Sequence, residues 1–463
     1  MNFIVIISDT FRRDHLGCYG NTWISTPNLD KFAGESLVFD RFYTGSFPTI
    51  PQRRDLFTGR FSFTYSDWGP LPYSEVTMAQ ALGEGGYGSY MVFDTPHLNN
   101  NGFWFDRGFS AWNWVRGQED DRFRSDPLHP EIPFDPAKLG DVADLYAQHL
   151  RNTRDRKYEE DYFTPMTMRE ATKWLERNYT NDRFLLYVDT FDPHEPWDPP
   201  KYYTDMYDPG YEGEEVHYPS YGSIDYLTPA ELKHIRAMYA GEVTMVDRWV
   251  GRLLRKIEDL GLYDDTAVIF TTDHGYYFGE HGLIGKCIMM YEEVRHVPFM
   301  IRVPGRKPGR TNYYAQAVDV MPTLLDLAGL PGTGTTHGRS FAPVLRGEES
   351  AGRGFAVSSW SIIHESTSDK VQSLNPYNWA DLAWALKPST LTTDEYVLIC
   401  GASDVYPELY HVPSDPREER NLYAERPDVA CKLHAQYIEF LESVQTPAEY
   451  LDRRRVLPEP AKR

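Results

Sequence analysis

Three short runs of consecutive apolar residues mark candidate buried strands, at residues 3–7, 184–188 and 267–270. The runs are continuous rather than alternating, which is typical of strands that are covered on both faces in a parallel sheet. Between and after them, apolar residues at helical spacing predict a long helix over residues 229–260 and a shorter one over 320–327. The pattern therefore favours a parallel sheet with helices between its strands.

Each of these runs ends in a polar cluster. Asp9 follows the first run, residues 189–194 follow the second, and Asp273 and His274 follow the third. In open α/β sheets, ligands gather beyond the carboxyl ends of the strands. The three clusters are therefore expected to contribute to one shared site.

The pattern changes after Gly347. Short strand-like pieces at 355–359 and 396–399 precede a final helix predicted over 427–444. We therefore predict two domains, residues 1–347 and a smaller one over 348–463. Residues 198–229 are rich in Tyr, Pro, Gly and Asp, and we expect them to form a long loop that serves as a lid or substrate wall.

The net charge of the chain limits the classes of partner that the protein is expected to bind. The chain has 463 residues and a formal net charge of −21, which argues against nucleic acid and anionic membranes but leaves room for a small anionic substrate in a local positive pocket. The N-terminus lacks the features of a secretory signal, and no window reaches the length of a membrane span. We expect a cytoplasmic protein, and homo-oligomerisation stays open.

Asp273 and His274 are the first candidates for chemistry. A carboxylate beside an imidazole suits Zn²⁺ or Mn²⁺, whereas further carboxylates would suit Ca²⁺ or Mg²⁺. An isolated Asp-His pair also occurs as a capping Asp with a structural His, and Asp9 alone could cap a turn. Downstream, Lys286 could supply a positive charge for an anionic oxygen.

Six motifs, in one order along nearly the whole chain, resemble the sulfatase branch of the alkaline phosphatase superfamily. One such motif would be weak evidence, but six collinear ones are not. They are IISDTFRRDHLGCYG around Asp9, TIPQR and LFTGR from Thr49, PHEP around His194, TTDHGYYFGEHGLIGK from Thr271, VDVMPTLLDLAGLP from Val318 and ELYHVPSDPREERNL from Glu408.

The resemblance implies a doubly wound, mostly parallel α/β domain with a smaller C-terminal α+β domain. It also implies one divalent metal ion, with Mn²⁺ or Zn²⁺ favoured and Ca²⁺ or Mg²⁺ as alternatives. The implied metal ligands are Asp9, Thr49, Asp273 and His274; the catalytic residues are Thr49 as nucleophile, Arg53, His194 and Lys286; the substrate-binding residues are His97 and His281.

The chain departs from the family pattern at several positions. Sulfatases have Cys, or sometimes Ser, in a C-x-P-S-R context that is oxidised to formylglycine, whereas this chain has Thr49 and Gln52 there. Thr10 replaces the second aspartate of the usual N-terminal pair. The family's Gly-Lys-x-His motif appears without its lysine in the segment that ends at His97. His274, where many sulfatases have Asn, resembles the phosphonate monoester hydrolase and phosphodiesterase subgroup.

A plain threonine changes the chemistry that is expected. The hydrate of formylglycine has a spare hydroxyl that expels sulfate, and threonine lacks it, so its covalent intermediate must be hydrolysed at the central atom. Phosphoryl groups tolerate such attack, whereas a sulfated threonine would tend to stall. We therefore predict a metal-dependent hydrolase of phosphate diesters or phosphonate monoesters. The alternatives are a sulfatase that works without formylglycine and a catalytically inactive binding protein.

Overall fold

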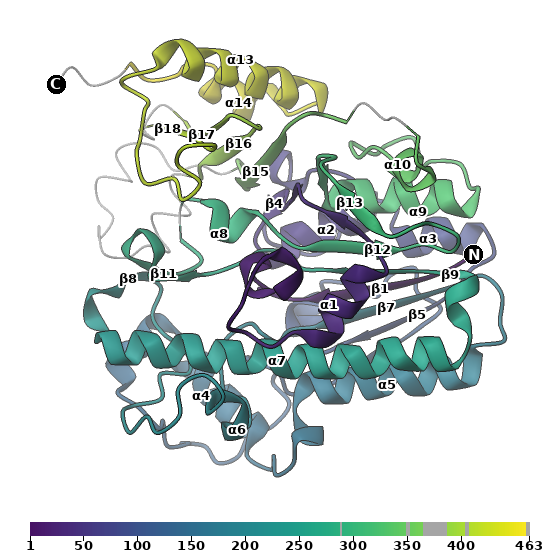
Figure 1. Ribbon diagram of the computed structural model, residues 1–463, viewed down its shortest axis with the longest axis vertical. Helices are drawn as coiled ribbons and strands as arrows, with labels where there is room; N and C mark the ends of the chain where they lie inside the picture. The colour runs from purple at the N-terminus through teal and green to yellow at the C-terminus, as the bar shows by residue number, and fades with distance from the viewer. Residues whose placement is uncertain (288, 349–351, 364–386, 403–406, 460–463) are drawn as a thin grey trace.

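The computed structural model describes residues 1–287, 289–348, 352–363, 387–402 and 407–459 (Figure 1). Its centre is an eight-stranded sheet with the strand order β13-β2-β12-β9-β1-β7-β5-β6. In that order the strands span Gly309–Thr311, Leu37–Phe39, Phe299–Arg302, Thr266–Thr271, Asn2–Ser8, Phe184–Thr190, Gly88–Phe93 and Ala111–Trp114.

The middle of this sheet is parallel. Strand β1 pairs in parallel with β7 and β9, and β5 pairs in parallel with β7 and β6. Strand β12 is antiparallel to both of its neighbours, so the sheet is mostly rather than wholly parallel. The three strands predicted from continuous apolar runs are confirmed as β1, β7 and β9, and all their residues are buried.

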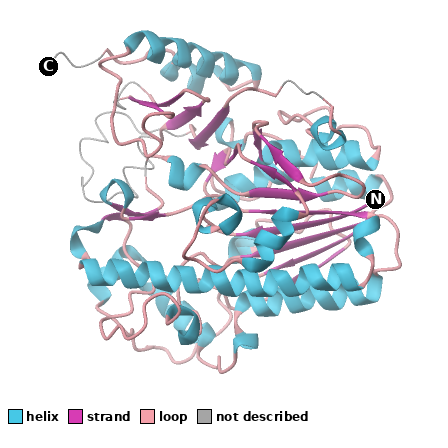
Figure 2. Cartoon of the chain, in the orientation of Figure 1, coloured by secondary structure: helices cyan, strands magenta, loops and turns pink. Residues whose placement is uncertain are grey.

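Helices cover both faces of the sheet (Figures 1 and 2). Along β1, Ile4 and Ile6 pack into one apolar core, while Phe3, Val5 and Ile7 pack into the other. One core is shared with α1 (Pro27–Gly34), α5 (Phe163–Asn178) and α7 (Pro229–Asp259), and the other with α2 (Thr49–Thr58), α3 (Met78–Glu84), α9 (Val320–Ala328) and α10 (Ala342–Arg346). This arrangement confirms the doubly wound α/β prediction.

Capping residues explain where helix α7 begins and where helix α9 ends. Helix α7 begins with a capping box in which Thr228 accepts a hydrogen bond from the Glu231 backbone N–H. Helix α9 ends at Gly329, whose φ of 69° suits a residue without a side chain.

A second sheet lies beneath helix α13 (Pro427–Ser443) (Figure 1). Its order is β18-β17-β16-β15-β4, with bounds Glu408–His411, Tyr396–Cys400, Ser389–Thr392, Ala356–Trp360 and Ser46–Phe47. Strand β4 comes from early in the chain and pairs in parallel with β15. The second sheet therefore takes one strand from the N-terminal side of the predicted boundary at 347/348, and that boundary stays a prediction.

The remaining short elements connect these layers. They are β3 (Phe42–Tyr43), β8 (Gly222–Ser223), β10 (Tyr277–Phe278), β11 (Leu283–Gly285), β14 (Ala315–Gln316), α4 (Ala143–Thr153), α6 (Lys201–Thr204), α8 (Glu292–Arg295) and α14 (Ala448–Leu451). The long loop predicted at 198–229 contains α6 and β8. Among the described residues, the helices all fall short of the length and apolar character needed to cross a membrane.

Truncating the central strand tests this packing. Ile6 is fully buried between Val188 and Phe270 of the flanking strands. We expect Ile6→Ala to lower the free energy of unfolding by about 2–5 kcal/mol, because it removes buried methyl groups and leaves a cavity. Urea denaturation measures this change, and Val456→Ala, at a side chain that is 65% exposed, is the control with a change within about 0.5 kcal/mol. Equal effects of the two substitutions would contradict the assignment of β1 to the core.

Candidate active site

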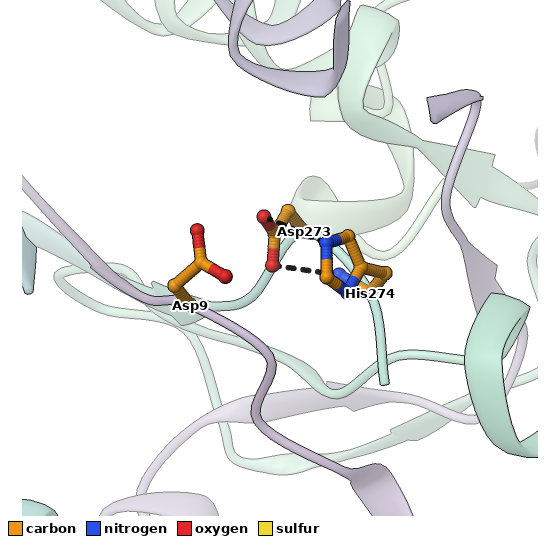
Figure 3. Close-up of side chains that lie close together, drawn as sticks. All are labelled: Asp9, Asp273 and His274. Atoms are coloured by element: carbon orange, nitrogen blue, oxygen red, sulfur yellow. Dashed lines mark hydrogen bonds and ion pairs between the residues drawn. The ribbon is translucent and has the colours of Figure 1, made fainter. Parts of the chain in front are cut away.

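Two adjacent strands of the central sheet bring the predicted metal ligands together. Asp9 directly follows β1, and Asp273 and His274 follow β9, its parallel neighbour. One ligand atom from each residue lies within 4.8 Å of those of the other two (Figure 3). All three residues are fully buried. The cluster therefore forms at the carboxyl edge of the sheet. The polar residues that follow the predicted strands indicated a site at this edge.

The imidazole of His274 is oriented so that one nitrogen faces this cluster. Its Nδ1 lies 3.0 Å from the carbonyl oxygen of Gly275, to which it donates, and its ring packs 4.9 Å from that of Phe47. Nε2 lies 3.4 Å from Oδ2 of Asp273. Among the described residues, neither of these two buried atoms makes a hydrogen bond of the usual geometry, although Oδ2 forms an ion pair with Arg53. Such an arrangement leaves a nitrogen lone pair and a carboxylate oxygen directed at the same place.

The charges of the cluster differ from those of free side chains. Burial lowers the pKa of His274 to about 4, so its imidazole is neutral at physiological pH. Burial and the neighbouring Asp273 raise the pKa of Asp9 well above its usual range. Burial opposes ionisation of Asp273 too, but His274 and Arg53 hold the pKa of that carboxyl below its usual range.

Arg53 lies in the middle of the acidic groups. Its guanidinium donates to Asp189 through Nε at 2.8 Å and Nη2 at 3.0 Å, and Nη2 also donates to Asp9 at 3.1 Å. Nη1 lies 2.9 Å from Oδ2 of Asp273. The side chains of all four residues are fully buried. The structure thus joins Arg53, one of the catalytic residues implied by the family resemblance, to three strand ends.

The donor set fits a divalent cation. If all three carboxylates are ionised, they and one guanidinium leave two formal negative charges in a buried space, which a divalent cation would balance. A neutral imidazole with carboxylates suits Mn²⁺ or Zn²⁺, and one imidazole nitrogen and one carboxylate oxygen lack hydrogen bonds. The residues that would hold the ion are Asp9, Asp273 and His274.

Thr49 occupies the first position of helix α2, one helical turn before Arg53. Residues four apart lie on the same face of a helix, so Thr49 and Arg53 face the same side. Phe47, two residues earlier, packs on the ring of His274. The predicted nucleophile thus begins a helix whose positive end favours anions, beside the acidic cluster. Thr10, which replaces the second family aspartate, donates its hydroxyl to Asp9 at 2.7 Å.

His194 and Lys286 lie against each other. Lys286 Nζ contacts Nε2 of His194 and lies 3.5 Å from Oε1 of Glu195, while Nδ1 of His194 donates to the Glu195 carbonyl at 2.6 Å. Burial and the Lys286 ammonium lower the pKa of His194 well below its usual range. His194 is therefore neutral and accepts from Lys286, and Lys286 is the cation of this pair.

The two predicted substrate-binding histidines lie apart from the acidic cluster. His97 pairs with Glu119 at 3.0 Å, and its ring packs against Phe191, which stacks on His194 at 3.9 Å. His281 stacks on Tyr291 and lines a separate cavity of about 780 Å³. His97 is thus one ring away from the predicted catalytic residues, whereas His281 faces the separate cavity.

Several neighbours of the site were missed in the sequence. Asp189 holds Arg53, and its signal was its position at the end of the second apolar run. Tyr221 contacts Glu195, and its ring lies 5.6 Å from Lys286 Nζ. Tyr221 belongs to the loop at 198–229, which was expected to form a substrate wall. No pattern in the sequence indicated that Tyr221 would contact Glu195.

The orientation of His274 can be tested at Gly275. A Cβ atom there would lie 2.0 Å from the carbonyl oxygen of Glu293, so Gly275→Ala must move the backbone that accepts from His274. We expect a loss of about 10–100-fold in Mn²⁺ affinity, as is typical when the partner of a metal-binding imidazole is disturbed. Isothermal titration calorimetry measures the affinity. The matched control is Gly83→Ala, where a Cβ meets no atom within 4 Å; an equal affinity in both variants would contradict the assignment.

Comparisons with known proteins find relatives along most of the chain. The profile of the sulfatase family matches residues 1–330, and that of the N-sulphoglucosamine sulphohydrolase C-terminal region matches residues 279–445. The chain is 25% identical to an N-acetylglucosamine-6-O-sulfatase of Bacteroides thetaiotaomicron, over 96% of this chain and 86% of that protein. It is 28% identical to an arylsulfatase of Clostridium perfringens, over 82% and 85% of the two chains.

The fold is shared with solved structures as well. The phosphonate monoester hydrolase of Agrobacterium radiobacter has a TM-score of 0.77 and 22% sequence identity to this chain, and the likeness covers 96% of this chain and 97% of that one. At this identity the likeness concerns the fold. The family profile, which spans most of the chain and includes every strand end of the acidic cluster, shows more: the chain belongs to the sulfatase family of ester-cleaving hydrolases.

Proposed function

We propose that this protein is a metal-dependent hydrolase of phosphate diesters or phosphonate monoesters, with Thr49 as its nucleophile. The observation that carries the proposal is the threonine at the head of α2, beside the acidic cluster, where the family has the precursor of formylglycine. The proposed substrate is a small anionic ester. The comparisons include both sulfatases and phosphonate monoester hydrolases, so the nucleophile is what favours phosphorus over sulfur.

The chemistry follows from what threonine can do. Its hydroxyl attacks phosphorus, and the bond to the leaving oxygen breaks as that oxygen takes up a proton. Water then hydrolyses the threonine ester at phosphorus, which is a phosphodiester or a phosphonate ester according to the substrate. A sulfated threonine has no comparably easy route, because the spare hydroxyl of a formylglycine hydrate is missing. A divalent cation held by Asp9, Asp273 and His274 would polarise the ester and lower the pKa of the threonine hydroxyl.

The protein's own groups supply the remaining steps. The amide groups at the start of α2 favour the negative charge of the ester. Lys286 is the candidate acid for the leaving oxygen, since its ammonium faces the neutral His194, whose Nε2 accepts from it. His194 then orients Lys286 and does not itself give up a proton, because its Nδ1 hydrogen is already bonded to the Glu195 carbonyl. This refines the catalytic role implied for His194 by the family motif.

The nucleophile gives the decisive prediction. We expect the Mn²⁺-supplemented protein to cleave bis-p-nitrophenyl phosphate or p-nitrophenyl phenylphosphonate faster than p-nitrophenyl sulfate. Thr49→Ala should lower the phosphoester rate by about 10³-fold or more, because no hydroxyl remains to attack. Thr49→Ser, which keeps the hydroxyl, is the matched control and should retain most of the activity.

The same assay can also give results that would indicate one of two other functions. Faster sulfate turnover that disappears in Thr49→Ala would indicate a sulfatase working without formylglycine. A protein that binds Mn²⁺ but turns over none of these esters would indicate a binding protein. Either result would overturn the proposal.

The role of Lys286 is tested with leaving groups. If Lys286 protonates the leaving oxygen, Lys286→Ala should slow phenyl esters by about 10²–10⁴-fold and p-nitrophenyl esters much less, because the better leaving group needs less protonation. The measurement is kcat/KM across a series of substituted phenyl phosphodiesters. Equal losses across the series would assign Lys286 to substrate binding alone. Lys256→Ala, at a half-buried lysine of α7 that pairs with Glu176, is the control, and no change in kcat/KM is expected there.

A further inference from the structure

A second cluster of metal-ligand type lies beside the site described above. Ligand atoms of His97, Glu119 and Asp120 lie within 4.8 Å of one another. His97 comes from the turn after β5, and the two acidic residues come from the loop after β6. The cluster therefore also forms near the carboxyl edge of the central sheet, beyond a different pair of adjacent strands.

Glu119 is buried, yet one of its oxygens lacks a hydrogen bond. The residue is 2% exposed; Oε1 accepts from the Tyr218 hydroxyl at 3.2 Å, whereas Oε2 has no hydrogen-bond partner among the described residues. Oε2 lies 3.0 Å from Nε2 of His97, outside hydrogen-bond geometry. A buried carboxylate oxygen and an imidazole nitrogen thus face each other at 3.0 Å outside hydrogen-bond geometry, an arrangement that suits two ligands of one cation.

The surroundings hold these donors in place. The ring of His97 packs between Trp68 at 5.2 Å and Phe191 at 5.6 Å. The backbone N–H of Glu119 donates to the Gln118 side chain, which in turn donates to Asp192 at 2.9 Å. Both bonds are buried, so the loop that carries the glutamate is anchored to the end of β7.

The cluster is acidic, and within the described part of the chain neither carboxylate has a lysine or arginine as its ion-pair partner, although Arg122 acts on Asp120 through its charge. Glu119 has His97 as its ion-pair partner there, and Asp120 accepts from the neutral amide of Asn100 at 3.2 Å. Two carboxylates beside one imidazole form an acidic donor set.

We propose that His97, Glu119 and Asp120 bind a second divalent cation of the Mn²⁺ or Zn²⁺ class, at a site separated by the ring of Phe191 from the predicted catalytic residue His194. The mixed carboxylate and imidazole ligands set this class. The site needs no assumption about which ester the protein cleaves.

The location suggests what such a cation would contribute. Phe191 contacts His97 on one side and stacks on His194 on the other, so the second site borders the predicted catalytic pair. The family's lysine is missing from the segment that ends at His97. A divalent cation there would supply the positive charge for a substrate oxygen that this lysine supplies in the family pattern. This role, unlike the site itself, rests on the proposed function.

Metal stoichiometry tests the site without any turnover assay. The full chain is stripped with a chelator, dialysed against Mn²⁺, and its bound manganese is measured by mass spectrometry. We expect two ions per chain in the unaltered protein, one in Glu119→Gln, one in Asp273→Asn and none in the double variant. Near-ultraviolet circular dichroism checks that each variant keeps its tertiary packing.

Two further variants keep the test decisive. Asp120→Asn changes a less buried ligand and should also leave one ion, even if Glu119→Gln were to disturb folding. Glu242→Gln removes the charge of another buried glutamate with an unbonded oxygen, in helix α7, and should leave both ions bound. One ion in the unaltered protein, or two ions that persist in Glu119→Gln and Asp120→Asn, would overturn the second site. A failed ester assay with two bound ions would count only against the proposed function.

Discussion

The burial of one guanidinium among three carboxylates is the constraint on which this site depends. Arg53 reaches from helix α2 to Asp9, Asp189 and Asp273, each at the end of a different central strand. Removing one partner of a buried ion pair is costly, because the other charge then lacks both water and a counter-ion. Three such partners therefore fix α2 against the edge of the sheet, and with it the position of Thr49 at the first turn of the helix.

The same constraint explains why the site is suited to a cation. One guanidinium cannot balance three carboxylates, and burial prevents water from doing so. Without a metal ion, the excess is relieved by protonation, which the raised pKa of Asp9 reflects. An acidic protein can in this way handle an anionic ester: the negative charges of the protein bind cations, and the cations face the substrate. The cluster at Glu119 has the same ligand types, two carboxylates and one imidazole.

The fold of this protein does not by itself determine which reaction it catalyses. The sulfatase profile and the likeness to a phosphonate monoester hydrolase describe the same scaffold, which carries both kinds of chemistry. In this chain, the side chains that bear on the choice between the two kinds of chemistry are few, and they lie at the strand ends and in the first turn of α2. Thr49 stands where the family has the precursor of formylglycine, and Lys286 is in close contact with Nε2 of His194.

The sequence by itself determined the central strands, the long helix α7 and the meeting of Asp9, Asp273 and His274, because continuous apolar runs and polar strand ends are local signals that a parallel sheet brings to one edge. Only the tertiary structure decided which charges pair. It assigned Asp189 to Arg53, moved β4 into the second sheet beside β15, and brought Glu119 to His97 from a loop with no regular pattern. Such pairings depend on the path of loops and on the cost of burying each charge, and neither leaves a periodic mark in the sequence.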